Sequence, residues 1–125
     1  NDSHKFICKN IYLKVETKNT LVTNQYAEKA IQIPIAHGEG KYFADEKTMK
    51  SLIQNDQILF KYCDANGNIT EQANPNGSLL NIAGICNADR NIFGMMPHPE
   101  RAADKELNNQ DGFTLFKSIL AEILL

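Results

Sequence analysis

A histidine and a carboxylate two residues apart, His98 and Glu100, are the residues of this sequence best suited to acid–base chemistry. Each follows a proline, in the order Pro97-His98-Pro99-Glu100. A proline disfavours the helical region for the residue before it, so His98 is expected to be extended. Residues two apart in an extended chain project to the same side, where the imidazole can act as a general base and the carboxylate can fix its tautomer. The alternative is a structural histidine in a proline-rich turn.

The elements that must position this pair can be expected from the apolar pattern. The run Ile92 to Met96, which leads into His98, is expected to form a strand, and open α/β sheets hold ligands at the carboxyl ends of strands. Four other strands are expected at Phe6 to Val15, with a bulge near Asn10, and at Ile31 to Ala36, Ile58 to Tyr62 and Leu79 to Cys86. Pro34 must lie where no ladder donor is needed.

Two helices are also expected. Asp45 is a suitable N-cap for a short helix with an apolar face of Met49, Leu52 and Ile53. Asp111 is a suitable N-cap for the last element, whose apolar face comprises Phe113, Phe116, Leu120 and Ile123, with Leu115 and Ile119 beside it. Residues 64–68 and 74–78 are turn clusters, and Asn66-Gly67 is a hairpin signal. Strands and helices together predict an α/β domain, or a piece of one.

The composition is that of an ordinary folded protein. The 125 residues are 42% hydrophobic and 22% charged, which supplies enough apolar material for a core. A net charge of −2 gives no electrostatic reason to expect nucleic acid as a partner. No apolar run reaches the roughly 20 residues that a membrane helix needs, and the first residues lack the apolar core of a signal peptide. We therefore expect a cytoplasmic protein with no nucleic-acid or membrane partner.

Cysteine chemistry gives little further information. Cys8, Cys63 and Cys86 are an odd, scattered set, which argues against a disulfide framework. No C-x-x-C pair occurs and the three histidines are dispersed, so a structural zinc site is not expected. Each cysteine lies in an apolar or alternating stretch, which predicts buried and unreactive thiols.

Longer strings around the His–Glu pair resemble a known family. Pro97 to Glu100 resembles the histidine–glutamate motif of class I glutamine amidotransferases. The neighbouring strings resemble, more narrowly, the glutaminase subunits of phosphoribosylformylglycinamidine synthase, an enzyme of purine biosynthesis. They are Asn81 to Ile85, Gly94 to Arg101, Pro34 to Tyr42, Asn74 to Ser78 and Asp111 to Phe113. The likeness follows the family's order over nearly all of the chain.

The resemblance implies a mechanism. In that family a cysteine thiolate attacks the side-chain amide of glutamine, ammonia leaves, and water hydrolyses the glutamyl thioester. By resemblance, His98 activates the thiol, because a paired imidazole lowers a thiol pKa, and Glu100 orients the histidine. Gly84 to Ala88 resembles the start of the family's nucleophile elbow. We reject Cys86 as the nucleophile, because an elbow needs a helix after the turn and here a polar turn and another strand follow.

Cys8 and Cys63 have no elbow context either. We therefore expect residues 1–125 to be the C-terminal part of a single amidotransferase domain, without the nucleophile elbow and inactive alone.

Two further segments resemble parts of the family. Ala36, His37 and Gly38 match a loop that, in related amidotransferases, holds glutamine largely through backbone groups, and glycines permit close backbone approach. The alternative is a glycine-rich turn around a satisfied histidine. For Asn74 to Ser78, ordinary turn chemistry is a sufficient explanation, and a role at a partner interface is the other possibility.

The family resemblance also implies a fold and partners. The family domain is a three-layer α/β sandwich of the flavodoxin-like type with a mainly parallel central sheet. This chain would supply its C-terminal part, including the antiparallel pair near the His–Glu motif and the last helix. Its glutaminases work with a large synthetase subunit and a small accessory subunit. ATP and Mg²⁺ are used by the synthetase, so no cofactor or metal is expected here. A glutaminase of another pathway and a non-catalytic interaction module stay open as alternatives.

Overall fold

A computed structural model describes residues 1–124 as a mixture of strands and helices. The strands are β1 (Ile7–Val15), β2 (Ile31–His37), β3 (Ile58–Cys63), β4 (Ile82–Cys86) and β5 (Phe93–Met95). The α-helices are α1 (Glu46–Gln54) and α2 (Phe113–Ile123). Short 3-10 helices are η1 (Leu79–Asn81), η2 (Pro99–Ala102) and η3 (Lys105–Leu107). The mixed α/β class and the expected helices and strands are confirmed, except that the strand expected from Leu79 begins at Ile82, after the 3-10 turn of η1.

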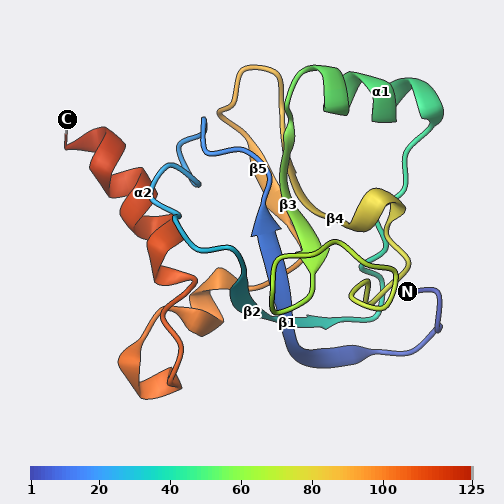
Figure 1. Cartoon of the computed structure of the whole chain (residues 1–125), viewed down its shortest axis with the longest axis horizontal. Coiled ribbons are helices and arrows are strands. Elements are labelled where there is room, and N and C mark those ends of the chain that lie inside the picture. The colour runs from blue at the N-terminus through green and yellow to red at the C-terminus, as the bar shows by residue number, and fades with distance from the viewer. Residues whose placement is uncertain (125) are drawn as a thin grey trace.

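The five strands form one sheet in the order β2-β1-β3-β4-β5 (Figure 1). Every pairing within residues 1–124 is antiparallel, whereas the family resemblance implies a mainly parallel sheet for a whole domain. The antiparallel pair expected near the His–Glu motif is β4 with β5, where Cys86 lies opposite Phe93. The loop between them closes with a bond from Asn87 N to Ile92 O at 3.1 Å, so this strand–loop–strand unit is confirmed.

The register between β1 and β2 runs without interruption from Ile7 opposite His37 to Leu13 opposite Ile31. The bulge expected near Asn10 is therefore wrong. Residues 8–10 are exposed on both faces of β1, so a polar residue there needs no bulge to keep it out of the core. The register shifts lie instead between β3 and β4.

Pro34 lies on the edge strand β2, opposite Asn10 of β1. Its carbonyl oxygen accepts a hydrogen bond from the backbone N–H of His98 at 2.8 Å. The carbonyl and the nitrogen of one strand residue point to the same side, so the missing N–H of Pro34 faces away from β1. This confirms that the proline occupies a position where the ladder needs no donor.

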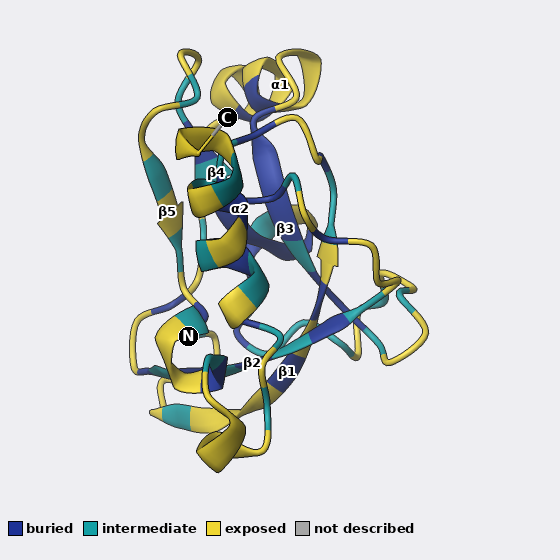
Figure 2. Ribbon diagram, turned by 90° about the vertical axis from the view of Figure 1, so that its left-hand side faces the viewer, coloured by how far each residue is buried: buried dark blue, intermediate teal, exposed yellow. Residues whose placement is uncertain are grey.

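The two faces of the sheet carry separate apolar clusters. One cluster includes Leu59 and Ala83 together with Leu115 of α2, and the other packs α1 against Ile58 and Ile82. Adjacent residues of one strand, such as Ile58 and Leu59, thus belong to different clusters, because successive side chains of a strand point to opposite faces of the sheet. Figure 1 shows α1 and α2 well apart on the sheet, and Figure 2 shows the largely buried strands behind α2.

Helix α1 begins as its sequence predicts. Asp45 Oδ1 accepts the backbone N–H of Thr48 at 2.7 Å, which confirms the N-cap. Met49 and Leu52 are buried on the expected face. Ile53, however, is 56% exposed, so its assignment to that face is wrong. Ile53 is next to Leu52, about 100° around the helix, and so turns away from the sheet.

Helix α2 differs from expectation at its start and on its buried face. The N-cap is Gly112, because the carboxylate of Asp111 accepts the backbone N–H of Gln32 on the edge of β2 at 2.7 Å. The predicted stripe is also wrong as a buried face, since three of its members are substantially exposed: Phe113, Leu120 and Ile123. Leu115 and Ser118 are buried instead, and Phe116 and Ile119 are partly buried against the core.

The turn at 64–68 forms, but it does not close a hairpin. Gly67 has a positive φ of 82°, and Asp64 N donates to Asn68 O at 2.9 Å. Strand β3, which precedes the turn, already pairs with β1 on one side and β4 on the other. No edge is left for a hairpin partner, so that part of the prediction is wrong.

Candidate active site

His98 and Glu100 lie in direct contact where the chain enters η2. His98 has extended backbone angles of φ −104° and ψ 90°, as its position before a proline predicts. Its Nδ1 lies 2.7 Å from Glu100 Oε1. The side chains are 32% and 58% exposed, so the pair faces solvent on the surface of the described residues.

The contact determines which nitrogen of His98 is free to act as a base. Partial burial tends to raise the pKa of Glu100, but the hydrogen bond and charge of His98 outweigh it and hold that pKa below its ordinary value. An ionised carboxylate only accepts hydrogen bonds, so Nδ1 must carry the proton. In the neutral imidazole Nε2 then keeps its lone pair, which is the arrangement that a general base needs.

Two close backbone contacts position the His98 segment. The bond from His98 N to Pro34 O attaches it to the outer edge of β2, shortly before Ala36, His37 and Gly38. On its other side, Gly112 at the start of α2 lies so close to the backbone of Pro99 that any side chain at Gly112 would overlap it. The structure thus brings the predicted pair beside the predicted loop.

His37 differs from expectation, because it is the last residue of β2 and is buried, 8% exposed. Its ring packs under Gly40, where a Cβ would overlap the imidazole. Nε2 lies 3.5 Å from Asn76 Nδ2, and Nδ1 has no partner among residues 1–124. Burial lowers the pKa of His37, and the positive charges of the N-terminus and His98 act in the same direction. One ring nitrogen of His37 therefore has a polar neighbour and the other has none. His37 is neither a residue of an exposed loop nor a histidine with both ring nitrogens hydrogen-bonded.

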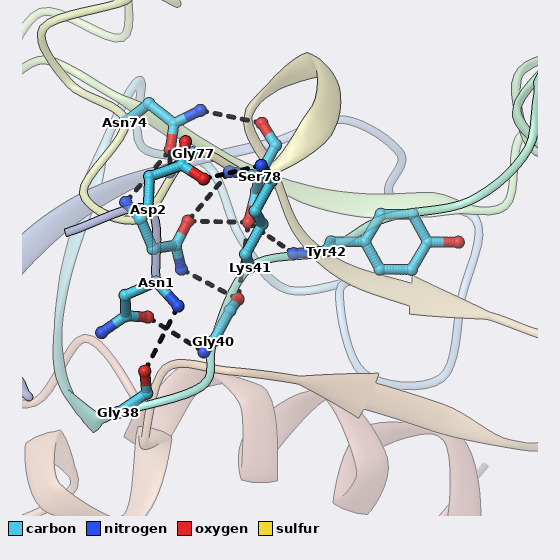
Figure 3. Close-up of polar contacts among 10 residues, drawn as sticks. Asn1, Asp2, Gly38, Gly40, Lys41, Tyr42, Asn74, Gly77 and Ser78 are labelled. Atoms are coloured by element: carbon cyan, nitrogen blue, oxygen red, sulfur yellow. Dashed lines mark hydrogen bonds and ion pairs between the residues drawn. The ribbon is translucent and has the colours of Figure 1, made fainter. Parts of the chain in front are cut away.

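Beyond His37, side-chain amides hold the loop backbone (Figure 3). Asn1 Oδ1 accepts the N–H of Gly40 at 3.0 Å, and Asn76 Nδ2 donates to the carbonyl of Gly40 at 2.9 Å. The backbone N–H groups of Gly38 and Glu39 have no acceptor among residues 1–124. Sequence reasoning missed Asn76, because Asn-Pro-Asn-Gly is typical of an exposed turn.

None of the three cysteines is placed to serve His98. Cys86 lies opposite Phe93, at the end of β5 farther along the chain from His98. Burial raises the pKa of Cys86, and it raises that of Cys63 to about 11. Cys8 is exposed, so its predicted burial is wrong, because it lies on the solvent-exposed first part of β1. No hydrogen bond joins its sulfur to His98 within the part of the chain that the structure describes.

Other features of the described residues bear on binding. An apolar pocket of about 340 Å³ lies between the 39–42 loop and β4 and β5, but neither His98 nor Glu100 lines it. Over residues 1–124, no group of three His, Cys, Asp or Glu side chains is placed to hold a metal ion. In the same range, neither helix has the length and apolar character needed to cross a membrane.

The chain is similar to curated proteins that are named as subunits of phosphoribosylformylglycinamidine synthase. It is 49% identical over 117 residues to the phosphoribosylformylglycinamidine synthase subunit PurQ of Methanocaldococcus jannaschii, covering 93% of this chain and 51% of that protein. It is 54% identical over 114 residues to the same subunit of a Synechocystis species, covering 90% and 51%. The chain therefore spans about half the length of these curated relatives.

A solved structure and a protein family agree with these relatives. The fold matches a chain in the structure of PurLQS from Thermotoga maritima with a TM-score of 0.77 and 38% identity, over 98% of this chain and 50% of that one. This match confirms the expected amidotransferase fold over that part. Residues 1–116 match the CobB/CobQ-like glutamine amidotransferase domain. The chain belongs to this family of glutamine amidotransferase domains.

Proposed function

We propose that this chain forms the His–Glu-bearing half of the glutaminase subunit of phosphoribosylformylglycinamidine synthase, which hydrolyses glutamine to glutamate and ammonia. The observation that carries the proposal is the 2.7 Å contact between His98 Nδ1 and Glu100 Oε1, attached to β2 immediately before the 36–38 loop. The similarity to subunits named PurQ supports this pathway over another amidotransferase pathway.

In the proposed reaction His98 moves protons through Nε2. It takes the proton of a cysteine thiol as the thiolate attacks the amide carbon of glutamine, and it returns that proton to the leaving ammonia. It then takes a proton from the water that hydrolyses the glutamyl thioester, and the thiol is regenerated. Glu100 holds the imidazole in the required tautomer throughout and stabilises its protonated form.

Substrate binding is proposed for the end of β2 and the start of the loop after it, at Ala36, His37 and Gly38. The backbone N–H groups of Gly38 and Glu39 have no acceptor among residues 1–124, and adjacent free N–H groups suit a carboxylate or a developing oxyanion. Both residues are exposed, so these N–H groups are accessible to a ligand from solvent.

The nucleophilic cysteine is proposed to come from outside this chain, because Cys8, Cys63 and Cys86 are all poorly placed. Residues 1–125 alone are then inactive. By analogy with the named relatives, the complete glutaminase would pass ammonia to a large synthetase subunit, with a small accessory subunit in the complex. ATP and Mg²⁺ would be used by the synthetase, and this chain would need no cofactor.

Glutamate release tests the proposal. We would compare residues 1–125 with the same residues joined to a segment corresponding to the remaining half of the relatives. We expect steady release only from the joined form, and His98→Ala in that form should lower kcat by a factor of about 10² to 10⁴. His4→Ala, at an exposed histidine that forms no hydrogen bond with the pair among residues 1–124, is the matched control.

Three results would contradict the proposal. Steady release by residues 1–125 alone would show that the nucleophile lies within the chain. Full activity of His98→Ala would remove His98 from the chemistry. A joined form that binds the synthetase subunit and releases no glutamate would favour the non-catalytic interaction module.

A further inference from the structure

The peptide groups of Gly40 are held from two sides by side-chain amides that are far apart in sequence. Asn1 Oδ1 accepts the Gly40 N–H at 3.0 Å, and Asn76 Nδ2 donates to the Gly40 carbonyl at 2.9 Å (Figure 3). Asn1 Nδ2 also donates to the carbonyl of His37 at 2.9 Å. The loop between His37 and Gly40 is therefore fixed at both ends, while the N–H groups of Gly38 and Glu39 inside it stay free.

Asn76 is more buried than a turn requires. It is 2% exposed, and burying an amide without partners costs several kcal/mol. Besides the loop, its partners are Ser78 and Tyr62: Oδ1 accepts Ser78 N at 3.1 Å and Ser78 Oγ at 2.7 Å, and Nδ2 lies 3.3 Å from Tyr62 Oη. An exposed asparagine would form the same turn, so the burial indicates a second role.

A second set of contacts fixes the loop at Tyr42. Ser78 Oγ accepts the Tyr42 N–H at 2.9 Å, and Leu79 N donates to the Tyr42 carbonyl at 3.0 Å. Asn74 in turn fixes the 76–78 turn, since its Oδ1 accepts Gly77 N at 2.9 Å and its Nδ2 donates to the Ser78 carbonyl at 2.8 Å. The 74–78 turn is thus joined to the 38–42 loop by hydrogen bonds to the backbone groups of Gly40 and Tyr42.

The same contacts hold Gly40 over the ring of His37. Asn76 Nδ2 lies 3.5 Å from His37 Nε2, and the Cα of Gly40 covers the imidazole so closely that a Cβ there would overlap it. Releasing Gly40 would therefore loosen the loop and the His37 ring together. The His98–Glu100 contact shares none of these hydrogen bonds.

We infer that Asn76 is a positioning residue, which holds the 38–42 loop in the conformation that binds glutamine. This inference rests on the proposed function, because it takes the loop to be the glutamine-binding element. Asn76 acts through Gly40 and does not touch the substrate. Asn74 and Ser78 support it by shaping the turn that carries Asn76.

The variant Asn76→Asp tests this inference in the joined, complete glutaminase. The new carboxylate keeps the acceptor for Ser78, but it replaces the donor to Gly40 with an oxygen that repels the carbonyl. We expect KM for glutamine to rise about tenfold or more, with kcat changed by less than about threefold, because a loss confined to substrate binding appears in KM. The backbone amides of Gly40 and Tyr42 should exchange with solvent at least about tenfold faster.

Asn66→Asp is the matched control, because it makes the same chemical change in the exposed 64–68 turn. It should leave both KM and amide exchange unchanged. If Asn76→Asp does not fold, Ser78→Ala provides the test, since it removes the acceptor for Tyr42 N; it should speed exchange at Tyr42 and raise KM.

The outcomes separate this inference from the proposed function. Wild-type KM and wild-type exchange in Asn76→Asp, in an enzyme that hydrolyses glutamine, would overturn the role of Asn76 and leave the function intact. Faster exchange with an unchanged KM would also overturn it, because the loop would be released without consequence for the substrate. A wild-type joined form without glutaminase activity would refute the proposed function, whatever the exchange at Gly40 shows.

Discussion

The backbone N–H of His98 donates to the carbonyl oxygen of Pro34 at 2.8 Å, so the candidate base is attached to the outer edge of β2. Two residues earlier on that edge, Gln32 donates its N–H to Asp111 Oδ2 at 2.7 Å and accepts from Asn109 Nδ2 at 2.8 Å. The edge of the sheet is thus covered by the candidate site and by the segment before α2. This arrangement places the acid–base pair and the loop on one rigid element.

Glu100→Gln should lower kcat of the complete glutaminase by a factor on the order of 10² or more, because an amide can donate to Nδ1 and leave the proton on Nε2. Steady-state kinetics with glutamine would measure the effect. Glu106→Gln is the control, because Glu106 is an exposed carboxylate in η3 outside the pair. A change in kcat below about threefold would show that Glu100 does not determine the tautomer.

Gly38→Val should raise KM for glutamine without lowering Tm. A Cβ at Gly38 would meet only Phe6 Cδ2 at 3.8 Å, an ordinary contact, so the fold can accept the side chain. The valine would nevertheless occupy the space beside the free N–H groups of the loop. Gly40→Ala provides the contrast, because its Cβ would overlap the His37 ring and should lower Tm. An unchanged KM in Gly38→Val would remove this loop from the binding site.

Gly112→Ala should lower the free energy of unfolding by about 1–3 kcal/mol, because its Cβ would collide with the backbone of Pro99 and force the two segments apart. Denaturant unfolding would measure the loss. Gly94→Ala is the matched control: no atom lies within 4 Å of a Cβ there, so the change should stay within about 0.5 kcal/mol. Equal effects of the two substitutions would contradict the close approach at Pro99.

Thiol titration should find one reactive cysteine in the native chain at pH 8 and three after denaturation. Cys8 is exposed, whereas Cys63 and Cys86 are buried. Burial raises the pKa of the Cys63 thiol to about 11 and also raises that of Cys86, so both remain protonated and shielded. Rapid reaction of a second thiol would show that one of these side chains is accessible. Cys86→Ala should also leave the activity of the complete enzyme intact.

Asp45→Ala should lower Tm at pH 7, because it removes the N-cap of α1. The hydrogen bond from Thr48 N holds the pKa of Asp45 below 3.8, its usual value. A carboxyl whose pKa is depressed by folding contributes stability above pH 3.8 and loses it as pH falls through the folded-state pKa. The Tm difference should therefore shrink in strong acid. Asp89→Ala, which removes an exposed carboxylate that caps no helix among residues 1–124, is the control for the Tm at pH 7; a Tm difference for Asp45→Ala that stays constant with pH would argue against the cap.

Features that depend on neighbouring residues could be predicted from the sequence. The prolines around His98 restrict its backbone, and the extended conformation and the contact with Glu100 follow from that restriction. The cap at Asp45 likewise needs only residues three positions away. The requirement that Pro34 lie where the ladder needs no donor is also local and is confirmed, although the sequence did not indicate that β2 would be an edge strand or which segment would cover it.

Features that depend on distant partners could not be predicted. Asp111 has the sequence of an N-cap, but its carboxylate binds Gln32 instead. Helix α2 has apolar residues on more than one side, and its periodicity could not indicate that Leu115 and not Leu120 faces the core. The burial of Asn76 depends on Gly40 and Tyr62, and an asparagine in a turn motif gives no sign of either contact.

The two edge strands of the sheet, β2 and β5, differ in a way that limits self-association. On β2, Pro34 offers no donor, and Pro34 and Gln32 are already bonded to His98, Asp111 and Asn109, whereas the outer side of β5 pairs with no strand among residues 1–124. A strand-to-strand contact between two copies of these residues is therefore expected at β5. Such a contact uses the same patch on both copies and leaves no free strand for a third, so it ends at a pair and cannot grow into a fibre.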